Sequence, residues 1–433
     1  MHPVVLDIPA LSLVLLAGAS SAGKTTFARR HFAPEEVISS DMCRALVSNS
    51  ETNQQASRDA FEVLYLIVRK RLRRGLLTVV DATHVQAQDR APLLAMAHRY
   101  HVAAVMILLD LPLDTVRERH TRRPDRHFED YVLTRQYDQL QASLPQLSQE
   151  GLHTLYILRS PAEIDAAAVR RIPLPQHRQA DTGPFDIIGD VHGCLPELLA
   201  LLTRLGYTVT PDTLAVTPPP GRRAVFVGDL TDRGPDSPGV LRLVMQMVAA
   251  GTALCVAGNH DDKLARALSG HPVNISSGLE LTLSQLRQTS PAFTEEVRVF
   301  MRGLPSHYVL DEGRLVVAHA GLRESMHGRD TPEVRKNCLY GETNGEKDAY
   351  GMPVRLDWAA GYRGQAWVIF GHTPVPEPVW KNRTLNLDTG CVFGGALTAL
   401  QYPEMRLVSV PARQTYVMPK RPFLPQHLAD TPE

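Results

Sequence analysis

Five short apolar runs in the C-terminal half of the chain each lead directly into side chains of the kinds that bind metal ions. Their motifs are GDVHG at 189–193, GDLTDRG at 228–234, GNHD at 258–261, HAG at 319–321 and GHT at 371–373. Buried strands hold ligands rigidly, and the loops that follow stay open to substrate. Carboxylate, amide and imidazole donors together suit Mn, Fe, Zn or Ni better than Mg²⁺ or Ca²⁺, which prefer oxygen alone. The repeated pattern of an apolar run followed by ligand-type residues therefore predicts a hydrolase with two metal ions.

In this order the motifs resemble the calcineurin-like metallophosphoesterases, nearest their phosphoprotein-phosphatase branch. The resemblance implies a centre of two divalent ions, expected to be Mn²⁺, with Asp229 as the bridging ligand. It also implies that Arg233 grips the phosphate and that His260 protonates the leaving oxygen, with Asp232 as its orienting partner. The implied metal ligands are Asp190, His192, Asp229, Asn259, His319 and His372. Each motif alone is compatible with a turn after a buried strand, and Asp232 could instead pair with a neighbour, but chance does not readily produce five motifs in the family's order.

The N-terminal half carries a glycine-rich loop, GASSAGKT at 18–25, between an apolar run at 11–16 and a helical pattern. A strand, this loop and a helix form the phosphate-binding P-loop of nucleotide-dependent enzymes. Its backbone amides would cradle phosphates, while Lys24 supplies charge to the β- and γ-phosphates and Thr25 supplies a Mg²⁺ ligand. The predicted binding residues for ATP or another NTP are Gly18, Ser20, Ala22, Gly23, Lys24, Thr25, Thr26 and, as an outer-sphere Mg²⁺ partner, Asp81.

Two further features indicate phosphoryl transfer to an acceptor. Asp41 follows the second predicted strand, where it could act as general base on a hydroxyl, and Arg44 could hold the acceptor's own phosphate. A basic segment at 117–127 is typical of a lid over the triphosphate, with Arg126 and then Arg119 as the candidates for contact. Asp41 is equally compatible with a helix N-cap, and most of these arginines with a solvated helix face.

Composition indicates a soluble globular chain. The 433 residues carry 46 basic and 46 acidic side chains, so any nucleic-acid contact must be a local patch. Five widely spaced cysteines without a CxxC pair argue for a reducing compartment and against a disulfide framework or a structural zinc site. No apolar run reaches membrane-spanning length. We therefore expect a cytoplasmic protein with no membrane contact. The expected parts are an α/β P-loop NTPase domain with a parallel sheet at 1–160, a Pro-rich linker at 161–184, a calcineurin-like metallophosphoesterase α/β sandwich at 185–412 and a Pro-rich tail at 413–433.

Longer motifs carry a second resemblance. GASSAGKTTF, SSDMCR, VVDATH and RRPDRHF are similar to the polynucleotide 5′-kinase module, although small-molecule kinases share the loop and the position of Asp41. The segments at 338–364 and 387–395, together with the kinase-then-phosphatase order, resemble the bacterial polynucleotide kinase-phosphatases that repair broken RNA. The resemblance implies a phosphate-site role for Asp388, NTP- and Mg²⁺-dependent phosphorylation of 5′-OH ends, and removal of 2′, 3′ or cyclic phosphates from RNA. It also implies a 3′-terminal RNA methyltransferase and a separate ligase as partners, and it leaves DNA ends and a homodimer open.

Other functions remain open at this level. The family usually continues into a ligase-like domain, and no KxDG motif follows Val410, so we expect no sealing activity. One alternative is a protein phosphatase or dinucleoside-polyphosphate hydrolase fused to a nucleotide-binding or small-molecule kinase module. A non-enzymatic alternative is a nucleotide-gated protein that grips nucleic acid. Activity on RNA ends, on phosphopeptides or on diadenosine tetraphosphate separates these hypotheses.

Overall fold

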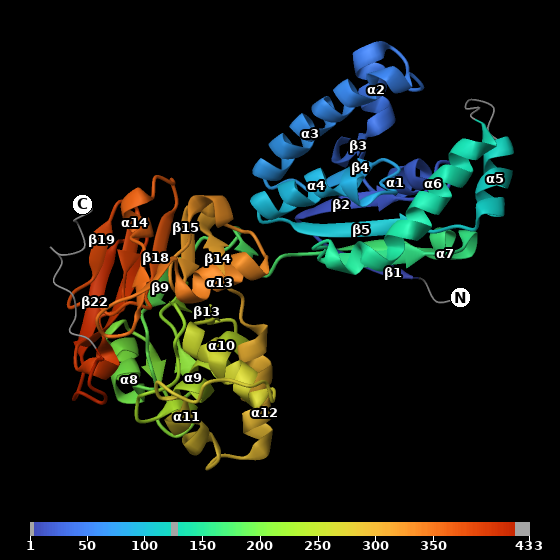
Figure 1. Cartoon of the computed structure of the whole chain (residues 1–433). Coiled ribbons are helices and arrows are strands. Elements are labelled where there is room, and N and C mark those ends of the chain that lie inside the picture. Colours follow the sequence, from blue (N-terminus) through green and yellow to red (C-terminus); the bar gives the residue numbers. More distant parts are fainter. Residues whose placement is uncertain (1–3, 123–128, 421–433) are drawn as a thin grey trace. The chain divides into compact units, whose positions relative to one another are not determined.

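The computed structural model describes residues 4–122 and 129–420 (Figure 1). The chain divides into two compact units, which are described here one at a time. The N-terminal unit comprises Met1–Leu174 with the short segment Arg329–Thr331. The C-terminal unit comprises Pro175–Gly328 and Pro332–Glu433.

A five-stranded parallel sheet with the order β3-β4-β2-β5-β6 forms the centre of the N-terminal unit. All six residues of its central strand β2 are buried. Leu13 and Leu15 of β2 face a core that includes α3 and α4, whereas Val14 and Leu16 face a core that includes α1 and α7. This double burial explains why β2 is a continuous apolar run. The strands are β2 (Ser12–Ala17), β3 (Val37–Ser39), β4 (Thr78–Asp81), β5 (Ala103–Leu109) and β6 (Thr154–Leu158). The helices are α1 (Lys24–His31), α2 (Ser40–Ser48), α3 (Ser57–Arg73), α4 (Ala87–Arg99), α5 (Leu113–Thr121), α6 (Asp130–Ser143) and α7 (Pro161–Ala166).

The segment 161–184, which we expected to be a linker, is folded. It begins with α7 and continues into β7 (Ala168–Ile172), which pairs in parallel with β1 (Val5–Pro9). It then enters the C-terminal unit with β8 (His177–Arg178), which pairs with β14 (His307–Leu310). Both pairing partners lie far away in the sequence, so a local search for apolar periodicity does not find these short strands.

Two sheets packed face to face form the C-terminal unit. Ile187 and Val225 of the first sheet meet Val317 and Ile369 of the second in one apolar core. The first sheet contains, in order, β13 (Ala253–Cys255), β12 (Arg223–Phe226), β9 (Phe185–Ile188), β21 (Ala396–Tyr402) and β22 (Arg406–Pro411). The second contains β19 (Val379–Lys381), β20 (Thr384–Asn386), β18 (Trp367–Phe370), β15 (Leu315–Ala318), β14 (His307–Leu310) and β8. The expected α/β fold class is confirmed for both units.

Helices cover the outer face of the first sheet, where Ile188 and Phe226 contribute to a second apolar core with α8, α9, α10 and α12. The segment between Leu264 and Phe300, which phosphatase chemistry does not by itself demand, is largely helical. The helices of this unit are α8 (Leu195–Arg204), α9 (Ser237–Ala249), α10 (Asn259–Leu268), α11 (Leu279–Leu286), α12 (Pro291–Gly303), α13 (Pro332–Tyr340) and α14 (Trp358–Gly361). Two small hairpins complete it, β10 (Thr208–Val209) with β11 (Val216–Thr217) and β16 (Thr343–Lys347) with β17 (Pro353–Arg355).

Strand direction brings the metal-binding motifs together. β9, β12 and β13 are neighbouring parallel strands, so the loops that follow them leave the sheet at one edge. β15 and β18 are also parallel neighbours, and they end directly before the HAG and GHT motifs. Loops after parallel strands meet at the carboxyl ends of those strands, where ligands bind in α/β folds.

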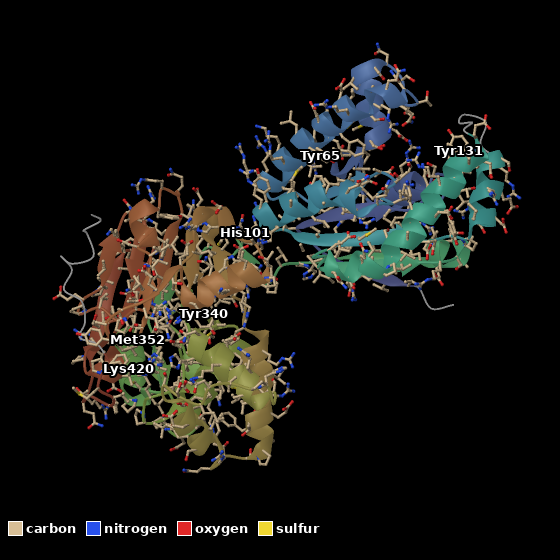
Figure 2. All side chains as sticks on the ribbon, viewed as in Figure 1. Tyr65, His101, Tyr131, Tyr340, Met352 and Lys420 are labelled. Carbon is tan, nitrogen blue, oxygen red and sulfur yellow. The ribbon has the colours of Figure 1, made fainter. Side chains whose placement is uncertain are left out.

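The described chain continues past residue 412, our expected domain end, to Lys420 on the C-terminal unit (Figure 2). The backbone N–H of Arg413 and the hydroxyl of Tyr416 both donate to the buried carboxylate of Glu197 on α8. The start of the expected tail therefore belongs to the folded unit. None of the helices in the described part of the chain combines the length and apolar character needed to span a bilayer.

A buried ion pair in the N-terminal unit generates a stability prediction. Arg90 is 0% exposed, and its guanidinium donates to both carboxylate oxygens of Glu150 at 2.7 and 2.6 Å. Substitution Glu150→Ala leaves a buried charge without its partner, so we expect the free energy of unfolding of this unit to fall by about 3–5 kcal/mol. Urea unfolding followed by circular dichroism measures the change.

The control is Asp7→Ala, which breaks the exposed pair with Arg170. Solvent screens that pair, so its loss should change the unfolding curve little. Equal effects of the two substitutions would contradict the structural role of the buried pair.

Candidate metal centre and nucleotide pocket

The P-loop lies between β2 and the N-terminus of α1. Gly18 has φ +140°, and a Cβ added there would lie 2.6 Å from the carbonyl oxygen of Leu109, so only glycine fits. The ammonium of Lys24 donates to the carbonyl oxygens of Gly18 and Ala19 at 2.9 Å each. Thr25 donates its hydroxyl hydrogen to Asp81 at 2.7 Å. Lys24, Thr25 and Asp81 therefore lie at one site beside the loop.

A cavity of about 920 Å³ joins the P-loop to the predicted acceptor residues. Asp41 and Arg44 line it together with Lys24 and Thr25. Arg44 donates to Asp41 at 2.7 Å and to the carbonyl oxygen of Glu51 at 2.6 Å. Asp41 is not the N-cap of α2, because the Ser39 side chain accepts from the backbone N–H of Asp41.

The predicted lid is described only in part. Arg126 lies outside the described residues. Arg119 on α5 donates to the carbonyl oxygen of Ala22 in the P-loop at 2.9 Å. Gln136 on α6 accepts from the backbone N–H of Ser20 at 2.8 Å, a contact that sequence reasoning missed because glutamine in a helix carries no motif.

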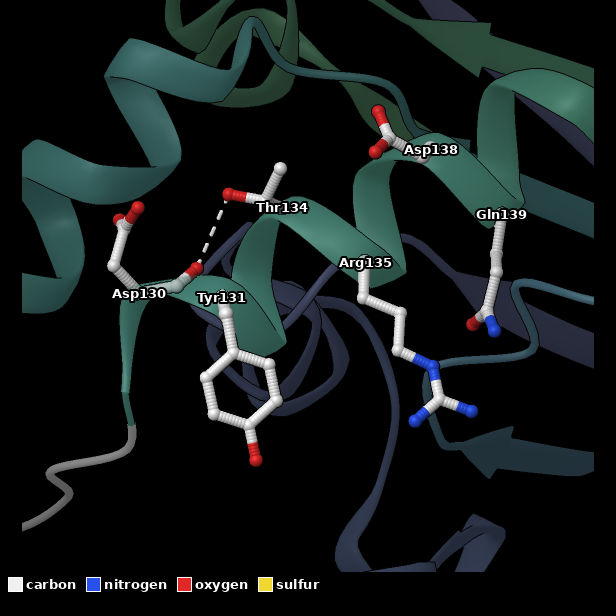
Figure 3. A pocket seen from close by; sticks show the side chains of 6 residues that line it. All are labelled: Asp130, Tyr131, Thr134, Arg135, Asp138 and Gln139. Carbon is white, nitrogen blue, oxygen red and sulfur yellow. Dashed lines mark hydrogen bonds between the residues drawn. The ribbon is translucent and has the colours of Figure 1, made fainter.

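A separate hollow of about 520 Å³ lies along α6 and contains none of the predicted site residues (Figure 3). Its lining residues are Asp130, Tyr131, Thr134, Arg135, Asp138 and Gln139. Thr134 uses its hydroxyl to donate to the backbone carbonyl of Asp130 at 3.2 Å within the helix. This hollow therefore adds nothing to the nucleotide pocket.

In the C-terminal unit, Asp229 belongs to two clusters of possible metal ligands. One contains His192 and His260 and the other His319 and His372, and within each cluster the ligand atoms lie within 4.8 Å of one another. Asp229 is 2% exposed, and its Oδ2 lies 3.5 Å from His192 Nε2 and 3.4 Å from His319 Nε2. This position between two histidine groups is the one that a bridging carboxylate requires.

Hydrogen bonds at Nδ1 determine how His192 and His260 present their other nitrogen. His192 Nδ1 donates to the carbonyl oxygen of Thr231 at 2.8 Å, and His260 Nδ1 donates to Asp232 at 2.6 Å. Each ring therefore directs the lone pair of Nε2 into the site, where the Arg233 guanidinium donates to both at 2.6 and 2.8 Å. The predicted partnership of Asp232 with His260 exists in the structure.

At His319 and His372, atoms with lone pairs converge in a buried space. His319 Nδ1 donates to the carbonyl oxygen of Val227, while its Nε2 lies 3.0 Å from Asn259 Oδ1 and 2.9 Å from His372 Nδ1. Asp190 Oδ1 and His372 Nε2 are buried and have no hydrogen-bond partner. Because a cation satisfies such groups and the protein here does not, the donor set fits divalent metal ions.

Burial sets the electrostatics of the centre. It raises the pKa of Asp190 well above the ordinary value, and the charges of Asp388 and Asp229 raise it further. Burial also raises the pKa of Asp388 to about 6. Burial, followed by the charge of Arg233, lowers the pKa of His192 well below its usual range. Carboxylates that crowd together resist ionisation, so bound cations would restore their charged forms.

Several site residues have a strained backbone. They have positive φ, between 46° and 74°, which side-chain-bearing residues rarely adopt. Strain of this kind persists only where surrounding structure enforces it, and it is typical of functional sites. The residues are His192, Asp229, Asp232, Arg233 and His372.

Two positioning residues escaped the sequence analysis. Asp261 is 0% exposed and accepts from the backbone N–H groups of Leu230 and Gly258, so it ties two ligand loops together. Thr282 on α11 donates to Asp232 Oδ1 at 2.7 Å and accepts from its backbone N–H at 3.0 Å. The helical insertion thus holds the carboxylate that orients His260. Thr282 lies in no motif, whereas Asp261 is the last residue of GNHD, where the sequence analysis gave it no role.

Comparison with known proteins agrees with this geometry. Residues 183–376 match the calcineurin-like phosphoesterase family, and residues 13–147 match an AAA domain family. A bis(5′-nucleosyl)-tetraphosphatase PrpE of Anoxybacillus flavithermus is 48% identical over 244 residues, which are 55% of this chain and 99% of that protein. The proteins of the same name from Geobacillus thermodenitrificans and Bacillus subtilis are 49% and 45% identical over 240 and 236 residues, 54% of this chain and 97% and 96% of theirs.

The chain belongs to the calcineurin-like phosphoesterases. In this phosphoesterase all six predicted metal ligands, from Asp190 to His372, lie within the matched segment. The fused N-terminal unit is a P-loop domain with a parallel sheet.

The contact between Thr282 and Asp232 generates a kinetic prediction. Thr282→Val removes the hydroxyl but keeps the shape, so Asp232 and His260 lose one constraint on their orientation. Since a tenfold rate change corresponds to about 1.4 kcal/mol, and a hydrogen bond to a charged group contributes about that much or more, we expect kcat on an aryl phosphate to fall about tenfold.

Thr289→Val is the matched control, because the Thr289 hydroxyl in the same insertion donates only to the carbonyl oxygen of Leu286. Its kcat should stay close to that of the unmodified phosphoesterase. An unchanged kcat in Thr282→Val would show that the insertion does not support the acid group.

Proposed function

We propose that this phosphoesterase heals broken RNA ends, with the P-loop unit phosphorylating a 5′-OH and the C-terminal unit removing phosphate from the opposite terminus. One observation carries the proposal: the nucleotide pocket also contains Asp41 and Arg44, a base and a phosphate-binding cation on the acceptor side. A P-loop that only senses nucleotide does not need this pair. A chain that adds phosphate in one unit and hydrolyses phosphate in the other suits a substrate with two unlike ends.

In the kinase reaction, Lys24 would bind the β- and γ-phosphates and Thr25 the nucleotide's Mg²⁺. Asp41 would accept the proton of the attacking hydroxyl, which makes its oxygen a better nucleophile. Arg44, which is 8% exposed and already bonded to Asp41, would orient this carboxylate and bind the acceptor's phosphate. Arg119 would add positive charge beside the P-loop.

In the hydrolytic reaction, divalent ions bound by Asp190, His192, Asp229, Asn259, His319 and His372 would supply Lewis acidity to the phosphoryl group. Arg233 lies between His192 and His260, where its guanidinium can bind phosphoryl oxygens. With Nδ1 held by Asp232, His260 can donate a proton from Nε2 to the leaving oxygen when the ring is in its doubly protonated form. Asp388 is 4% exposed, and its charge raises the pKa of Asp190. We expect it to form one wall of the phosphate site.

A second candidate is dinucleoside-tetraphosphate hydrolysis by the C-terminal unit. The specific observation in its favour is the 48% identity to a relative named bis(5′-nucleosyl)-tetraphosphatase, 99% of which this chain covers. The same centre would then cleave a phosphoanhydride, with phosphate as the leaving group. This candidate leaves the acceptor side of the P-loop pocket without a role.

A substrate comparison tests the two candidates. RNA with 5′-OH and 3′-phosphate ends is incubated with ATP, Mg²⁺ and Mn²⁺, and both termini are analysed by gel and mass spectrometry beside matched DNA and diadenosine tetraphosphate. We expect a new 5′-phosphate and a new 3′-OH on RNA. Unchanged RNA termini together with rapid tetraphosphate cleavage would replace the first candidate with the second.

Two substitutions assign the reactions to their sites. Lys24→Ala should abolish 5′ phosphorylation and leave hydrolysis intact, because the two centres lie in separate folded units. Asp190→Asn should do the reverse. A loss of both reactions in either variant would contradict the assignment.

A further inference from the structure

A second cluster of possible metal ligands lies in the C-terminal unit outside the centre described above. It contains Cys194, Glu197 and Cys391, whose ligand atoms lie within 4.8 Å of one another. The three residues are 0%, 1% and 2% exposed, and both cysteines are free thiols. Cys194 precedes the first turn of α8, Glu197 lies within that turn, and Cys391 follows β20 in a short 3₁₀ turn.

The carboxylate of Glu197 is held in one orientation. Its Oε1 accepts from the backbone N–H of Arg413 at 2.8 Å and from the hydroxyl of Tyr416 at 2.9 Å. Its Oε2 is buried and has no hydrogen-bond partner. One oxygen is therefore fixed by donors, as metal-binding carboxylates commonly are, while the other remains available to a ligand.

Apolar packing does not account for this arrangement. The two cysteines belong to the apolar core that also contains Leu198 and Val392. A carboxylate oxygen buried there without a donor is unfavourable unless a cation or a proton compensates it. Two thiols beside it provide soft ligands, which select zinc-like ions over Mg²⁺ or Ca²⁺.

We propose that Cys194, Glu197 and Cys391 bind a structural Zn²⁺ ion that is separate from the hydrolytic centre. They would supply two thiolates and one carboxylate oxygen, ligand types that bind Zn²⁺. Each thiol loses its proton to solvent when it coordinates the metal. None of the three residues is among the predicted ligands of the hydrolytic centre.

The position of this site gives the ion a structural role. Cys194 comes directly after the GDVHG motif, which carries Asp190 and His192, and Cys391 follows the loop that carries Asp388. Arg413 and Tyr416 bring the segment after β22 to the same point. A bound ion would thus connect two loops of the hydrolytic centre with the end of the folded chain, and it would restrict the motion of all three.

Cobalt titration of the full chain tests the proposal, because Co²⁺ replaces Zn²⁺ and gives a sulfur-to-metal charge-transfer band in the near ultraviolet only with thiolate ligands. The imidazole and carboxylate ligands of the hydrolytic centre do not give this band. We expect the band in the unmodified chain and its displacement by Zn²⁺. Cys194→Ser and Cys391→Ser should each reduce it strongly, whereas Cys255→Ser, which removes a buried thiol elsewhere in the unit, should leave it unchanged.

Tyr416→Phe gives a graded test, since it removes one donor to Glu197 without touching a ligand. Loss of such an outer partner weakens metal binding about 10- to 100-fold, and we expect a Co²⁺ affinity reduced by that factor. Circular dichroism verifies that each variant is folded.

Absence of the band in the unmodified chain would overturn the proposal even if the serine variants did not fold. A band that survives in both folded serine variants would also overturn it. So would a mass lower by two hydrogens with no metal uptake, because the cysteines would then form a disulfide instead of binding metal.

Discussion

The carboxylate of Asp229 is the point on which the C-terminal unit depends. It is 2% exposed. Its charge acts to raise the pKa values of four buried neighbours, which are Asp190, His192, His319 and Asp388. Burying so many ionisable groups costs much free energy unless opposite charge compensates them. Arg233 supplies positive charge beside His192 and His260. The lone-pair atoms of Asn259, His319 and His372 face one another. Rigid strands and constrained loop backbones hold these groups together, in an arrangement that suits bound cations.

Hydrogen bonds from residues around the centre hold its side chains and loops in position. Asp261 joins two ligand loops through backbone N–H groups, and Thr282 reaches from the insertion to Asp232. These contacts restrict positions without taking part in chemistry. Restricting the catalytic groups before substrate arrives lowers the reorganisation that the reaction would otherwise require. The helical insertion, which appears dispensable from its sequence, is part of this support.

The two units offer different physical means of binding phosphate. A P-loop presents backbone N–H groups and a lysine ammonium, here that of Lys24, and this arrangement would suit a nucleotide that carries its own Mg²⁺. The C-terminal unit instead gathers imidazole and carboxylate groups that need ions of their own. Each site sits at the carboxyl end of strands in its own unit, so each can be altered without rebuilding the other.

The sequence by itself determined the P-loop and the α/β class and predicted the metal-ligand residues, because each depends on contiguous residues: a glycine pattern, an apolar run, a ligand type after a strand. It did not reveal the pairing of β1 with β7, the contact of Gln136 with the P-loop, Thr282 beside Asp232, or the grouping of Cys194 with Cys391. Only the tertiary structure decided these, because the partners are far apart in the chain and carry no local pattern. The same reason explains the segment 161–184, whose strands exist only through distant partners.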